Sequence, residues 1–67
     1  MPNIYRFKDK LPQIDEFSWI APDANIIGDI EIGACSSIWF GCTLRADVNH
    51  IRIGEYSNIQ DGAIVHA

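Results

Sequence analysis

Residues 20–44, IAPDANIIGDIEIGACSSIWFGCTL, have a large aliphatic side chain at every sixth position. A period of six fits neither the roughly 3.6-residue turn of a helix nor the simple alternation of a strand. Short strands joined by corners do satisfy it, if each hexad forms one side of a prism and its aliphatic residue points inward. The grid resumes after one gap of nine residues, and its eight anchors are Ile20, Ile26, Ile32, Ile38, Leu44, Ile53, Ile59 and Val65.

A second, mostly small set of residues follows the anchors at a distance of four positions. Glycine comes directly after two anchors, at Gly33 and Gly54, where a tight corner would favour it. Because the anchors are largely β-branched, strands are favoured over helices. We therefore predict an all-β fold in which three hexads close one coil of a parallel β-helix. The second set comprises Ala24, Ile30, Ser36, Cys42, Val48, Ser57 and Ala63.

The repeat predicts the extent of the solenoid. One coil covers residues 20–37, a second covers 38–58 and holds a three-residue insertion, and a third begins at Ile59. This amounts to about two and a half coils, whereas a solenoid normally needs about three stacked repeats and a cap. We therefore expect the β-helix of residues 20–67 to be truncated at its C-terminal end, or its last rung to be covered by something else.

Residues 1–19 show no sustained period. Prolines at positions 2 and 12 and the cluster Lys8-Asp9-Lys10 predict an extended lead-in with turns, containing one short strand near residues 4–7. The sequence thus divides into a lead-in segment, 1–19, and a hexapeptide-repeat segment, 20–67.

Composition excludes several classes of function. The 67 residues are 48% hydrophobic and 21% charged, which is typical of a globular chain. A net charge of −4 argues against nucleic acid or an anionic membrane as the main partner. No run approaches the roughly 18 apolar residues needed to span a bilayer, and no secretion leader is visible, so we expect a soluble, cytoplasmic protein. Without such a leader, Cys35 and Cys42 are interpreted as reduced packing residues.

The grid also predicts which polar side chains can meet. Arg45 directly follows the anchor Leu44, and His66 follows Val65 on the same side of the prism, one coil later. Residues so related stack about 4.8 Å apart and point outward. Asp47 and Asp61 lie near corners, and Gln60 directly follows the anchor Ile59 on the neighbouring side. The predicted outward patch comprises Arg45, Asp47, Gln60, Asp61 and His66.

Each of these residues also has a structural interpretation. His66 alone could be an ordinary surface histidine, Arg45 could form only an ion pair at a subunit contact, and Gln60 could cap a corner. His50 lies in the insertion and is interpreted as a loop residue. The neighbours Trp39 and Phe40 are interpreted as wall or interface packing rather than as a substrate platform.

A metal site would be incomplete on these residues. A catalytic zinc needs three protein ligands and an open position, which one histidine cannot supply. The missing ligands would come from further coils, from adjacent subunits, or from both.

Four segments resemble the γ-class carbonic anhydrase family, whose members are hexapeptide-repeat proteins. The hexads of residues 20–67 resemble the left-handed parallel β-helix of these proteins. The general preference for right-handed β crossovers would not predict that hand, so left-handedness is implied by the resemblance alone. The segments are SIWF (37–40), LRADVN (44–49), IRIG (51–54) and NIQDGAIVH (58–66).

The resemblance implies a role for each residue of the patch. His66 would be the first of three histidines that bind Zn²⁺ or another divalent metal, the other two being absent from this chain. Arg45 and Asp47 match an Arg-x-Asp motif implicated in anion binding and subunit contacts. Gln60 would hydrogen-bond the metal-bound water, and Asp61 would pair with the arginine across a trimer interface.

The resemblance therefore implies zinc-dependent, reversible hydration of CO₂ to bicarbonate in a full-length homotrimer. This chain would be an incomplete portion with weak activity or none. Val48 stands where the archetypal member has an acidic proton shuttle, so the resemblance carries over no proton-transfer residue. Two alternatives remain open: a hexapeptide-repeat, CoA-dependent acyltransferase, and a non-catalytic assembly subunit.

Overall fold

The computed structural model describes all residues, 1–67, and consists of strands joined by turns. None of its segments is a helix long and apolar enough to cross a membrane. The strands are β1 (Asn3–Tyr5), β2 (Gln13–Ile14), β3 (Trp19–Ile20), β4 (Asn25–Ile32), β5 (Ser37–Ile38), β6 (Thr43–Ile53), β7 (Asn58–Ile59) and β8 (Ile64–His66).

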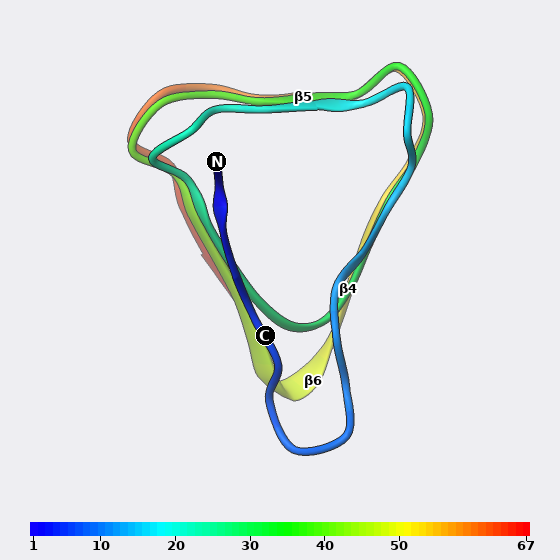
Figure 1. The fold of residues 1–67 in the computed structure, drawn as a ribbon, viewed down its shortest axis with the longest axis vertical. Coiled ribbons are helices and arrows are strands. Elements are labelled where there is room, and N and C mark those ends of the chain that lie inside the picture. Colours follow the sequence, from blue (N-terminus) through cyan, green and yellow to red (C-terminus); the bar gives the residue numbers. More distant parts are fainter.

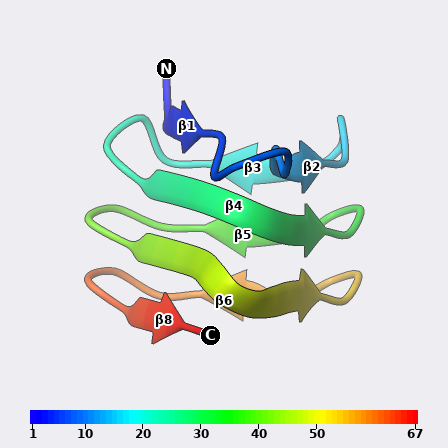
Figure 2. The same cartoon turned by 90° about the horizontal axis from the view of Figure 1, so that it is seen from below.

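All pairs between these strands are parallel, and viewed end-on the chain traces a triangle (Figure 1). Strands β3, β5 and β7 stack on one side, called here the β3 face. The β8 face consists of β1, the first parts of β4 and β6, and β8, while β2 and the last parts of β4 and β6 form the β2 face. Seen from the side, the coils lie one below another as a solenoid (Figure 2).

The strand register confirms the six-residue grid. Ile38 pairs with Ile20 above and Ile59 below, and Leu44 pairs in the same way with Ile26 and Val65. Anchors of one face thus stack in a column, so each coil buries the aliphatic side chains of the next. The four central anchors are buried, whereas the first anchor, Ile20, and the last three pack against this core and remain partly accessible.

The small residues of the second set fill the corners of the same core. Ala24, Ile30, Ser36 and Cys42 are all buried. The Ser36 hydroxyl donates to the Gly54 carbonyl at 2.7 Å and accepts from a backbone N–H, so its burial leaves no unpaired polar group. Both cysteines are free thiols, and Cys42 is buried as the packing interpretation predicts, whereas Cys35 is exposed and the interpretation is wrong for it.

Val48 departs from the pattern because the insertion forms a bulge. The pairing of β4 with β6 is regular as far as Gly28 with Ala46 and resumes at Ile30 with Ile51. Ile51 therefore takes the buried place that the grid alone would give to Val48, which is 86% exposed. In Figure 1 the bulged part of β6 projects outward at the lower corner of the triangle.

Residues 1–19 contribute strands to the same solenoid. β1 pairs with the start of β4, β2 pairs with its end, and Trp19 begins β3, so the segment contributes to all three faces. β1 covers residues 3–5, close to the short strand predicted near residues 4–7. The sequence signal for β2 is Ile14, which lies six residues before the first anchor assigned. The boundary at residue 20 stays a prediction about domain organisation.

Candidate functional site

Arg45 and His66 are direct cross-strand neighbours on the β8 face, as the grid predicts. The two residues pair in the register of β6 with β8, and both are exposed. Their anchors Leu44 and Val65 point into the core, so the alternation of a strand directs Arg45 and His66 outward. The hexapeptide core thereby fixes the backbone positions of both side chains.

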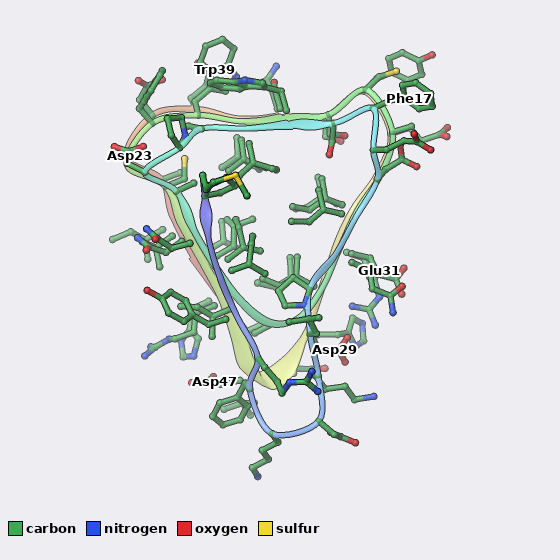
Figure 3. All side chains as sticks on the ribbon, viewed as in Figure 1. Phe17, Asp23, Asp29, Glu31, Trp39 and Asp47 are labelled. Atoms are coloured by element: carbon green, nitrogen blue, oxygen red, sulfur yellow. The ribbon has the colours of Figure 1, made fainter.

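Asp47 joins these two residues where the bulge of β6 begins. Its Oδ1 lies 2.9 Å from His66 Nε2, and its Oδ2 lies 3.8 Å from Arg45 Nε. The end of β8 is tied to β6 on both sides of Asp47, because the Val48 N–H donates to the Ala67 carbonyl and the Ala67 N–H to the Arg45 carbonyl. Figure 3 labels Asp47 at the lower corner of the prism. We call Arg45, Asp47 and His66 the charged cluster.

The hydrogen bond with His66 holds the pKa of the Asp47 carboxyl below its ordinary value. The charges of His66 and Arg45 act in the same direction, while partial burial opposes them. An ionised carboxylate can only accept, so the imidazole donates its Nε2–H to Asp47. In the neutral ring Nδ1 then carries the free lone pair, the arrangement in which a carboxylate orients a metal-binding histidine.

Replacing His66 by Ala is expected to raise the pKa of Asp47, because the carboxylate loses its hydrogen-bond donor. Since the folded pKa of Asp47 is lowered, the stability that this contact contributes is present above the ordinary aspartate pKa. It is lost as pH falls through the lowered folded pKa. NMR titration of the Asp47 carboxyl carbon in the metal-free protein measures the shift. His50→Ala, in the bulge, is the matched control, and an equal shift in that variant would contradict the assignment.

Gln60 and Asp61 lie apart from the charged cluster. Gln60 follows β7 on the β3 face, and its side-chain amide donates to Asn58 Oδ1 at 2.7 Å. Asp61 lies in the turn before β8, is exposed and forms no ion pair within the chain. The structure thus brings three of the five predicted residues together. Whether all five act in one site stays a prediction.

The donor set within residues 1–67 does not make a complete zinc site. No three side chains of the types His, Cys, Asp and Glu gather closely enough to hold a metal ion. His66 has the chemistry of a single zinc ligand with Asp47 behind it, and its exposed position leaves Nδ1 within reach of another chain or segment. These residues therefore fit a shared metal site and not one that this chain completes alone.

Sequence reasoning missed two groupings. Trp19, at the end of the lead-in, packs against Trp39 of the next coil, with ring centroids 4.9 Å apart. The six-residue grid places Trp19 in register with Ser37, two residues before Trp39, so the two indoles are diagonal neighbours on adjacent rungs. On the β2 face, Arg52 forms ion pairs with Asp29 at 3.1 Å and with Glu31 at 3.5 Å. His50 lies in the bulged part of β6 and not in a loop, so that prediction is wrong, and its side chain has neither a hydrogen bond nor an ion pair.

Comparison with known proteins identifies relatives in sequence. No protein-family model matches the chain. Over 58 residues, 87% of this chain, the sequence is 53% identical to gamma carbonic anhydrase 2, mitochondrial, of Arabidopsis thaliana. Other Arabidopsis proteins of that name are 50–52% identical over the same length. The chain spans 21% of the length of the first relative, about one fifth.

Solved structures identify the fold class. A candidate acetyltransferase from Bacillus cereus superposes with a TM-score of 0.89 at 35% identity, over 97% of this chain and 44% of the other. A hexapeptide transferase family protein from Anaplasma phagocytophilum gives a TM-score of 0.79 at 30% identity, over 97% of this chain and 51% of the other. The chain is thus a hexapeptide-repeat, left-handed parallel β-helix protein, as predicted. Its sequence relatives confirm the resemblance to the γ-class carbonic anhydrase family.

Proposed function

We propose that residues 1–67 supply part of the active site of a γ-carbonic anhydrase-like protein that hydrates CO₂ reversibly. The observation that supports this most directly is the charged cluster, in which Asp47 holds His66 by a 2.9 Å hydrogen bond beside an exposed arginine. The His66 imidazole is exposed on the β8 face. Oriented by a carboxylate, it is suited to bind a metal shared with other donors.

Each residue of the cluster has a distinct task in this proposal. Asp47 holds the ring of His66 through Nε2, so that Nδ1 is left to bind the metal ion. Arg45 has a long ion pair and a half-exposed side chain, and its five N–H donors are enough to contact both bicarbonate and a neighbouring copy. A zinc ion completed by donors from outside residues 1–67 would supply the activated water. Gln60 would orient that water through its amide.

The position of Asp61 supports the assembly that the family resemblance implies. This carboxylate has no cationic partner in its own chain, while Arg45 is only weakly paired with Asp47. The two residues lie on different surfaces, a corner and the β8 face, so a contact between copies that joins them is heterologous and can close into a ring. With the three subunits that the family resemblance implies, we infer a homotrimeric ring in which Asp61 of one copy lies next to Arg45 of the next.

The test is metal content and CO₂ hydration of the complete protein that contains residues 1–67. We expect bound zinc, or another divalent metal, together with hydratase activity that a chelator removes. A well-folded protein that assembles but neither retains metal nor hydrates CO₂ would refute the proposal and favour a non-catalytic assembly subunit. The relatives include proteins named as mitochondrial, so a cytoplasmic location stays a prediction.

An acyltransferase is the second candidate, favoured by the names of the structural relatives. Such an enzyme would bind CoA and transfer an acyl group without a requirement for zinc. CoA-dependent transfer that persists after chelation would support this alternative. The block of residues 58–66 and the charged cluster favour the hydratase.

A further inference from the structure

An aromatic patch covers the part of the β3 face that adjoins the corner before β6. Trp19 contacts both Trp39, with centroids 4.9 Å apart, and Phe40, with centroids 5.7 Å apart. Trp19 is 43% and Phe40 is 45% exposed, although an aromatic ring gains most when it is fully buried. Figure 3 shows Trp39 on the outer side of the prism. The aromatic patch consists of Trp19, Trp39 and Phe40.

The geometry of the aromatic patch favours packing against another protein surface over binding of a small planar ligand. The planes of Trp19 and Trp39 are inclined by 56°, and those of Trp19 and Phe40 by 67°, so the rings offer no shared flat platform. The Trp39 indole N–H is already used, because it donates to Ser37 Oγ at 2.9 Å. The indole of Trp39 and the ring of Phe40 therefore present apolar surface, of the kind enriched in the core of protein interfaces.

The patch continues directly into the corner that carries Asp61. Phe40 lies one rung above Asp61, and the two turns are joined by the Gly62 N–H, which donates to the Phe40 carbonyl at 2.8 Å. One corner thus presents an exposed aromatic ring and, next to it, a carboxylate without a partner. A surface complementary to this corner needs a cation that can form an ion pair with the carboxylate and also stack on the aromatic ring.

Arg45 offers these properties on the β8 face. Its side chain is 51% exposed, and it stacks in register below Ile27 and Tyr5, which add apolar surface beside the charge. Phe40 belongs to the same coil as Arg45, and Asp61 belongs to the next coil, that of His66. In a closed ring whose axis runs parallel to the solenoid axis, copies have no axial shift, so Phe40 of one copy would face Arg45 of the next at the same height. The Asp61 carboxylate, one rung or about 4.8 Å below Phe40, then also lies within reach of the Arg45 side chain.

We propose that the aromatic patch is the apolar part of the contact between copies of this chain, with Phe40 of one copy packed on the Arg45 side chain of the next. The inference rests on the assembly proposed above and adds the surface that would stabilise it. Asp61 and Phe40 together bind one guanidinium, the carboxylate by an ion pair and the ring by cation–π contact. Arg45 is thereby held in place from the neighbouring copy while its other edge faces Asp47.

The test is self-association of the complete protein carrying Phe40→Ala, measured by sedimentation equilibrium. We expect the dissociation constant between copies to rise about tenfold or more, as for a central aromatic interface residue. The matched control is Phe17→Ala, because Phe17 is 72% exposed on another corner of the prism (Figure 3), and we expect it to leave the constant unchanged. Equal association of the Phe40→Ala variant and the unmodified protein would overturn the inference.

Tryptophan emission gives a second measurement that leaves the aromatic patch itself unchanged. Trp19 and Trp39 are the two tryptophans of residues 1–67, and both belong to the patch. With any tryptophan outside residues 1–67 replaced by phenylalanine, dilution below the dissociation constant should shift the emission to longer wavelength as the patch meets water. A protein that stays monomeric at every concentration would also refute the inference. Assembly that depends on Phe40 without metal or hydratase activity would instead uphold the contact and refute the proposed function.

Discussion

Replacing His66 by Ala is expected to abolish zinc retention by the complete protein while the β-helix stays folded. His66 is exposed at the end of β8, and its side chain contributes only the contact with Asp47, so its removal leaves the core intact. A site that has lost one of three protein ligands falls below the number that a catalytic zinc requires. We expect the affinity for zinc to fall by more than the 10- to 100-fold loss typical of a supporting residue, so that bound zinc per subunit drops to about a tenth or less after dialysis.

Metal analysis together with circular dichroism checks this result. His50→Ala is the matched control, because His50 is also an exposed histidine and lies in the bulge next to the cluster. The control should retain zinc like the unmodified protein. Unchanged metal content in the His66→Ala variant would show that the metal, if present, is bound elsewhere.

Replacing Gly28 by Ala is expected to destabilise the protein by about 3 kcal/mol or more, combining backbone strain with steric overlap. Gly28 has φ +88, in the left-handed region that a Cβ disfavours. A Cβ at this position would also overlap with the carbonyl oxygen of Ala46 on the adjacent strand. That oxygen belongs to the backbone just before the bulge, so it cannot move aside without disturbing the position of Asp47.

Urea denaturation of the two variants Gly28→Ala and Gly41→Ala separates strain from overlap. Gly41 has a similar φ of +73, but the nearest atoms to an added Cβ, on Gly62, lie at an ordinary 3.8 Å. We expect only the left-handed strain in this control, about 1–2 kcal/mol. Equal losses of stability in the two variants would show that the close approach of β4 to β6 does not restrict the side chain at position 28.

Much of the fold could be predicted because its core is periodic. Inward anchors at a constant spacing need no knowledge of distant contacts, since each coil repeats the geometry of the previous one. The same grid predicted that Arg45 and His66 are neighbours. It failed for Val48, because an inserted segment can bulge at any point of its coil, and only the pairing of Ile30 with Ile51 places the bulge. Residues 1–19 were harder, since β1 and β2 form only by pairing with β4.

The sequence by itself determined the triangular β-helix, the inward columns of anchors and the outward direction of Arg45 and His66. These features follow from local periodicity. Only the tertiary structure decided that Asp47 turns back to His66, that Gln60 and Asp61 lie on another surface, and that Trp19 joins Trp39 and Phe40. Side-chain contacts at a bulge or between coils depend on the path of the backbone around a corner, and a six-residue period does not specify that path.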